Sequence, residues 1–192
     1  SLHLARRWRG KGEDRRYRAM RAAWGDRFPL ASLFVVFLLQ GTLLWIVSLP
    51  IQAAAALGTS RPLGPLDGLG AVLWAAGLAF EAVADAQLAR FLARPGSAGR
   101  VMQEGLWRYT RHPNYFGDAL LWWGMGLVAV SAGAAWALVG PALMTFLLVR
   151  VSGVALLERD IGRRRPEYAD YVARTSAFLP WPPRRAGSSS PG

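Results

Sequence analysis

Two long stretches without a charged residue decide what this chain can fold into. Residues 28–60 and residues 119–149 contain no Asp, Glu, Lys or Arg. A helix of about 20 apolar residues crosses the hydrocarbon core of a bilayer, about 30 Å thick, whereas core helices of soluble domains are usually shorter. The hydrophobic content of 53% also excludes a disordered chain. We therefore predict an all-α fold, a polytopic membrane helical bundle.

About four transmembrane helices are predicted in this bundle. The apolar segments lie at about residues 30–49, 66–88, 113–130 and 134–160. A loop is expected at 53–70, and Pro113 can open the third helix because proline is tolerated at the first helical position. Residues 1–185 are expected to form a single membrane domain, followed by a disordered tail at 186–192.

The charge distribution predicts how the helices cross the membrane. The net charge is +11, and the basic residues cluster in the N-terminal segment, at 89–111 and at 159–185. The two remaining loops carry Arg61 and no other basic residue. Because cytoplasmic loops are enriched in Lys and Arg, we expect an integral protein of a cytoplasmic membrane with both ends cytoplasmic. The positive charge is thus explained by contact with the lipid bilayer, the expected partner, and nucleic acid is not expected to bind.

Metal and thiol chemistry are not expected. The chain contains no cysteine and only two histidines. Thiolate ligands and a cysteine nucleophile are therefore excluded, and a site built from histidines is improbable. No metal is assigned.

Polar residues at the start of the third predicted helix form the first candidate site. Arg111, Asn114, Asp118 and Trp122 recur at helical spacing, which predicts one shared face, and Tyr115 is adjacent. The free N–H groups of a helix start favour a phosphate. A basic membrane flank explains Arg111, but it does not explain Asn114 and Asp118 inside an apolar helix, where polar groups are costly and usually functional.

Two acids in the second predicted helix form another candidate. Glu81 and Asp85 are one turn apart, so they share a face. Unpaired carboxylates there would repel each other. Two interpretations remain open, a structural ion pair with arginines of the loops or a site that receives ligand hydroxyls such as those of ribose. Glu158 and Tyr171 form a weaker, C-terminal candidate, because tyrosines on an amphipathic helix more often pack than react.

Four sequence blocks carry a family resemblance. GLWRYTRHPNYFGDALLWWG, which begins at Gly105, resembles the core of bacterial membrane proteins in the steroid 5-alpha-reductase-like family. RRWRGKGEDRRYRAMR, FEAVADAQLARF and RRPEYADYVARTSAFLPW resemble three further blocks of its uncharacterised bacterial branch. The RHPNY element alone is also shared with sterol reductases and with isoprenylcysteine carboxyl methyltransferases.

The resemblance implies a cofactor cavity that faces the cytoplasm. Asn114, Asp85 and Asp118 would contact the cofactor, with Asp118 where steroid reductases carry Glu. Glu81 stands where they have Asn, and Arg9 with Lys11 matches a basic pair near the cofactor phosphates. The expected cofactor-binding set is Arg9, Lys11, Glu81, Asp85, Arg111, His112, Asn114, Tyr115, Asp118, Glu158 and Tyr171.

The expected function is NADPH-dependent reduction of an enone, a carbon–carbon double bond next to a ketone, in a steroid-like or other lipid substrate. The relatives have about seven spans, so an N-terminally truncated chain without the substrate-facing catalytic acid and tyrosine is expected, and the catalytic residues stay unknown. Two alternatives remain, an S-adenosylmethionine-dependent methyltransferase of the isoprenylcysteine carboxyl methyltransferase type and a non-enzymatic lipid-binding membrane protein.

Overall fold

The predicted all-α fold is confirmed for the part of the chain that the computed structural model describes. The described residues are 15–57, 61–151 and 167–184. They form helices and no strand, apart from one isolated bridge between Thr110 and Ser176. The chain divides into two compact units, Ser1–Trp45 and Ile46–Gly192, and each is described by itself.

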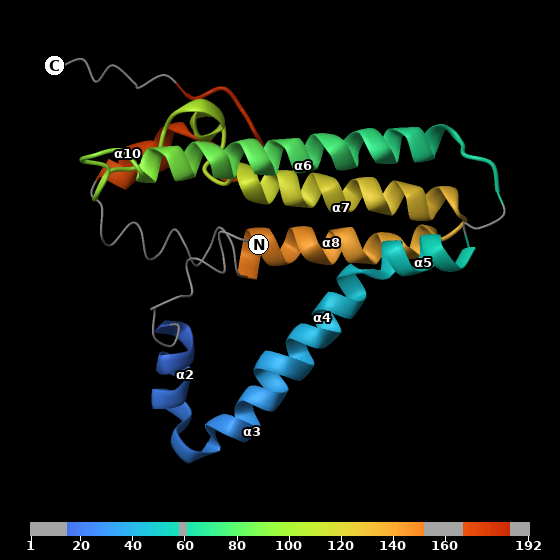
Figure 1. The fold of residues 1–192 in the computed structure, drawn as a ribbon, viewed down its shortest axis with the longest axis horizontal. Coiled ribbons are helices and arrows are strands. Elements are labelled where there is room, and N and C mark those ends of the chain that lie inside the picture. The colour runs from blue at the N-terminus through green and yellow to red at the C-terminus, as the bar shows by residue number, and fades with distance from the viewer. Residues whose placement is uncertain (1–14, 58–60, 152–166, 185–192) are drawn as a thin grey trace, which may run out of the picture. The chain divides into compact units, whose positions relative to one another are not determined.

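The described part of the N-terminal unit, from Arg15 on, consists of consecutive helical segments (Figure 1). They are α2 (Arg15–Trp24), the 3-10 helix η1 (Gly25–Arg27), α3 (Phe28–Ser32), the π-helix η2 (Leu33–Leu38) and α4 (Leu39–Val47), which runs on into the second unit. Pro29 lies in the first turn of α3, where its missing N–H costs nothing. Large apolar side chains such as Phe34, Phe37 and Trp45 are exposed here. An apolar surface of this extent suits contact with lipid.

The second unit begins with a helix where a loop is predicted. The loop prediction for 53–70 is wrong in its first part, because α5 spans Leu49–Leu57. Pro50 lies in the first turn of α5, a position that needs no N–H donor. The alanines that follow have the highest helix propensity, and Ala53 packs into a small buried cluster with other alanines.

Helices α6 (Pro65–Leu92) and α7 (Pro113–Ser131) form a closely packed antiparallel pair (Figure 1). Glycines line their contact. A Cβ atom added to Gly77 would lie 2.6 Å from the carbonyl oxygen of Gly117, and one added to Gly70 would lie 2.7 Å from that of Gly124. Glycine therefore allows the two backbones to approach more closely than any side chain would permit.

A polar network ties the start of α6 to the end of α7. The guanidinium of Arg61 donates hydrogen bonds to the carboxylate of Asp67, at 2.5 and 2.8 Å, and to the hydroxyl of Ser131, at 2.9 Å. The hydrogen bonds to Asp67 raise the pKa of Arg61 above its ordinary value. Asp67 also accepts hydrogen bonds from Ser131 and from the backbone N–H of Gly64. Arg61 is thus fixed by the helix ends.

The last predicted span is only partly described. It contains the 3-10 helix η4 (Ala135–Leu138), α8 (Val139–Phe146) and the π-helix η5 (Leu147–Val151). Residues 152–160 of that predicted helix lie outside the described part. The C-terminal helix α10 spans Glu167–Arg174, and Tyr171 lies on it.

Two of the described helical stretches are long and apolar enough to cross a membrane, by length and composition. They are Tyr17–Val47, with 31 residues, and Pro65–Leu92, with 28 residues. The stretch Ala135–Val151 is a shorter apolar helix. The count of four spans therefore stays a prediction, and so do the single-domain boundaries and the disordered tail, whose residues lie outside the described part.

Candidate functional site

The acids of α6 meet the first turns of α7. Gly117 brings them there, because a Cβ atom at this position would lie 2.7 Å from the backbone nitrogen of Glu81. Glu81 interacts electrostatically with both Asp118 of α7 and Asp85 of α6. The structure thus brings together three carboxylates that the sequence analysis assigned to two separate candidate sites. Glu81 and Asp118 are partly buried, whereas Asp85 is exposed.

Glu81, Asp85 and Asp118 are called the acidic cluster from here on. Polar and aromatic groups at the start of α7 adjoin it. Tyr115 interacts electrostatically with Asp85, and its ring stacks on that of His112 with 5.4 Å between the ring centroids. The side-chain oxygen of Asn114 accepts a hydrogen bond from the backbone N–H of Tyr115. The side chains of Asp118 and Trp122, one turn apart on α7, interact with each other. The structure therefore places Asn114, Tyr115 and Asp118 at one end of the helix pair, beside the acids of α6.

Arg111 is not on the face predicted for it. Helix α7 begins at Pro113, and the buried side chain of Arg111 lies before it. The Arg111 guanidinium donates hydrogen bonds to the carbonyl oxygens of Val172, at 3.1 Å, and Thr175, at 2.5 Å. The backbone N–H of Arg111 donates to Ser176. The prediction of a shared face is therefore wrong for Arg111, because the C-terminal segment supplies its partners.

The C-terminal segment is fastened to the loop before α7 by several hydrogen bonds. The hydroxyl of Thr110 donates to the carbonyl of Phe178 at 2.9 Å. The hydroxyl of Tyr171 donates to the carbonyl of Trp107, whose indole N–H in turn donates to the carbonyl of Ala84 on α6 at 3.1 Å. Tyr171 thus helps to hold the C-terminal segment against the loop before α7, and that loop is in turn bonded to α6. A role for it in cofactor binding stays a prediction.

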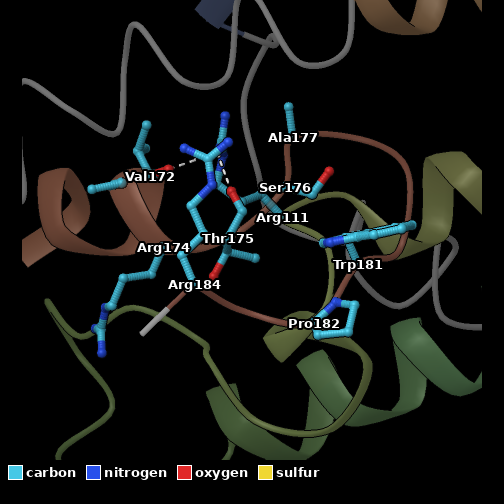
Figure 2. A pocket seen from close by; sticks show the side chains of 10 residues that line it. Arg111, Val172, Arg174, Thr175, Ser176, Ala177, Trp181, Pro182 and Arg184 are labelled. Carbon is cyan, nitrogen blue, oxygen red and sulfur yellow. Dashed lines mark hydrogen bonds between the residues drawn. The ribbon is translucent and has the colours of Figure 1, made fainter. Parts of the chain in front are cut away.

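A cavity of about 350 Å³ lies where Arg111 meets this segment (Figure 2). Three of its ten lining residues are arginines, namely Arg111, Arg174 and Arg184, and none of the ten is acidic. The prediction of site residues missed Arg174 and Arg184. A sequence signal exists, because the stretch from Tyr171 to Arg184 contains basic residues and a Trp but no acid.

The acidic cluster has the chemistry to hold the ribose or carboxamide part of a dinucleotide. Carboxylates accept hydrogen bonds from hydroxyl and amide donors, and the Asn114 amide can both donate and accept. Phosphates would be repelled by the three acids, but the N-terminal end of α7 favours an anion. Arg9, Lys11 and Glu158, which complete the predicted set, lie outside the described residues.

Comparison with known proteins gives one family match. The model of a family described as protein of unknown function (DUF1295) matches residues 1–175. No curated protein and no solved structure matches the chain.

Proposed function

The chain belongs to the DUF1295 family, a steroid 5-alpha-reductase-like family, and from this premise we propose that it is a membrane-embedded, NADPH-dependent reductase. The proposed substrate is an enone in a steroid-like or other lipid molecule. The observation that carries the proposal is the meeting of Glu81, Asp85 and Asp118 at one end of two apolar helices. Acids in such helices are costly, and they are retained chiefly where they serve a function.

The residues of the cluster would hold the cofactor by hydrogen bonding. Glu81 and Asp85, one turn apart on α6, would accept hydrogen bonds from ribose hydroxyls. Asp118 and Asn114 of α7 would bind the carboxamide end, with Tyr115 packed beside them. The glycine contact lets α6 and α7 pack closely, which brings the two sets of groups next to each other. Bound NADPH supplies the hydride for the β-carbon of the enone.

The phosphates of the cofactor would lie at the start of α7. The backbone N–H of Asn114 and the positive end of the helix dipole favour an anionic group there. Arg9, Lys11, Glu158 and Tyr171 enter the proposal through the family resemblance alone. Arg111 would act by holding the C-terminal segment against the loop before α7, since its guanidinium is bonded to the carbonyls of that segment.

Equilibrium titration of the purified chain in detergent tests the proposal. NADPH should bind, and Asp118→Asn should weaken the binding about 10-fold or more, because a hydrogen bond to a charged group contributes about 1.5–3 kcal/mol. Asp170→Asn is the matched control, since Asp170 is an exposed acid of α10.

The same titration with S-adenosylmethionine separates the alternatives. Binding of S-adenosylmethionine without binding of NADPH would replace the reductase by a methyltransferase. Binding of neither would favour a lipid-binding protein without enzymatic activity. Equal NADPH affinity of the wild type and Asp118→Asn would refute the assignment of the acidic cluster.

A further inference from the structure

The arginine-lined cavity at the C-terminal segment has a charge that the proposed reductase site does not use. Its walls contain Arg111, Arg174 and Arg184, and the described lining residues include no acid. Thr175 and Ser176 add hydroxyl and backbone groups to the same wall. A concave site with several guanidinium groups and no carboxylate favours an oxyanion, because guanidinium groups match phosphate geometry with paired N–H donors.

Carbonyl and amide oxygens hold two of these arginines in place. Arg111 is buried, with 8% of its surface exposed, and donates to the carbonyls of Val172 and Thr175 (Figure 2). Arg174 donates to the carbonyl of Asp170 and to the side-chain amide oxygen of Gln103. These carbonyl and amide oxygens orient both guanidinium groups.

A second cavity extends the basic region. It measures about 450 Å³, shares Arg174, Thr175 and Arg184 with the first cavity, and adds Arg108. The backbone N–H of Arg184 donates to the carbonyl of Arg174 at 2.9 Å, so the two exposed arginines stay next to each other between the cavities. The two cavities thus present four arginines.

The border of the first cavity is apolar. Trp181 lines it and is 70% exposed, and Val172 lines it at the opposite end in Figure 2. Leu179, two residues before Trp181, is 63% exposed. Trp is enriched where membrane and water meet, with its ring among the lipid headgroups. A cationic cavity with an exposed Trp and Leu beside it fits a ligand with an anionic head and an apolar body better than a free ion.

We propose that this cavity binds the phosphate group of an anionic phospholipid. The arginines would bind the phosphate, and Trp181 with Leu179 would contact the glycerol and upper acyl region. Such a lipid would hold the C-terminal segment at the membrane surface beside the start of α7. The proposal goes beyond the reductase function and does not depend on it.

Native mass spectrometry of the purified full chain tests this assignment. The chain is released from detergent in the presence of equal amounts of dioleoyl phosphatidylglycerol and dioleoyl phosphatidylcholine, and the retained lipids are counted. The wild type should retain phosphatidylglycerol in preference to phosphatidylcholine. The double variant Arg174→Gln/Arg184→Gln should reduce the preference about 10-fold, because two charge-assisted contacts are lost.

The double variant Arg90→Gln/Arg100→Gln is the matched control. It also removes two exposed charges, one near the C-terminal end of α6 and one in the loop that follows, but neither residue lines the two cavities described here. It should keep the wild-type lipid preference. Arg184→Gln alone, a milder change at an exposed residue, should give an intermediate loss.

Three outcomes would overturn the lipid proposal, and a fourth would separate it from the reductase proposal. Equal lipid retention by the wild type and the Arg174/Arg184 variant would remove the cavity as the site. Stabilisation by inorganic phosphate without a preference for phosphatidylglycerol would make free phosphate the ligand. Loss of NADPH binding instead of lipid preference in that variant would assign the cavity to the cofactor. A phosphatidylglycerol preference in a wild type that fails to bind NADPH would refute the reductase proposal and support this one.

Discussion

At the scale of single residues, Gly77 controls how closely α6 and α7 approach. An added Cβ would lie 2.5 Å from the backbone nitrogen of Leu121, and backbone atoms cannot move aside as a flexible side chain can. Gly77→Ala should therefore destabilise the folded chain by about 1–3 kcal/mol, the usual cost of overpacking. The midpoint of thermal unfolding in detergent measures this change.

The control lies on the same helix. A Cβ atom at Gly68 would meet nothing within 4 Å. Gly68→Ala should leave the midpoint unchanged or raise it, since Ala is favoured over Gly in a helix by about 1 kcal/mol. Equal midpoints for Gly77→Ala and Gly68→Ala would show that α6 and α7 do not pack through their glycines.

Tyr171 gives a second prediction for a single residue. Its buried hydroxyl donates to the carbonyl of Trp107. Tyr171→Phe should leave that carbonyl without this donor and lower the stability by about 1–3 kcal/mol. Tyr109→Phe, at an exposed tyrosine, should change the unfolding midpoint little. An unchanged midpoint with weaker NADPH binding in Tyr171→Phe would instead assign Tyr171 to the cofactor.

At the scale of elements, the network of Arg61, Asp67 and Ser131 ties two helix ends together. Asp67→Asn should lower the unfolding midpoint, because it removes the negative charge of the carboxylate to which the Arg61 guanidinium is hydrogen-bonded. The pair Arg94–Glu104 is the comparison, since both side chains are more than half exposed. Exposed ion pairs contribute little, so Glu104→Gln should change the midpoint much less. A larger effect of Glu104→Gln would contradict this ranking.

The helix starts that depend on local signals are predictable from the sequence. Pro113 opens α7 as expected, because proline preference at a first turn needs no distant partner. The same preference explains why Pro50 lies in the first turn of α5. The true boundary follows from the alanines after Pro50 and from their packing, which only the folded unit shows.

The acidic cluster is predictable only in part. Helical spacing places Glu81 and Asp85 on one face, but their proximity to Asp118 depends on how α6 packs against α7. The spacing of seven residues from Gly70 to Gly77, repeated at Gly117 and Gly124, is a sequence signal for that packing. The position of Arg111 has no such signal, because its acceptors Val172 and Thr175 are more than 60 residues away.

At the scale of the whole molecule, the proposed topology makes a prediction that is independent of any cofactor. Reporter fusions after Arg61 and after Arg100 should report opposite sides of the membrane, because α6 lies between them and is long and apolar enough to span. The fusion after Arg100 should be cytoplasmic, since its loop is rich in arginine. Reporters on the same side would refute both α6 as a span and the four-span topology.

Placement of NADPH at the acidic cluster is the central claim, and cysteine labelling tests it most directly. The chain contains no cysteine, so a single introduced thiol can be followed without background. Ala82 is exposed and lies three residues before Asp85 on the same face of α6, whereas Ala98 is exposed in the loop beyond α6.

The rate of maleimide labelling of Ala82→Cys and Ala98→Cys is measured with and without NADPH in detergent. We predict that NADPH slows labelling of Ala82→Cys severalfold and leaves Ala98→Cys unchanged. Labelling of Ala82→Cys at the same rate with saturating NADPH, or slowed by S-adenosylmethionine alone, would contradict the proposed site.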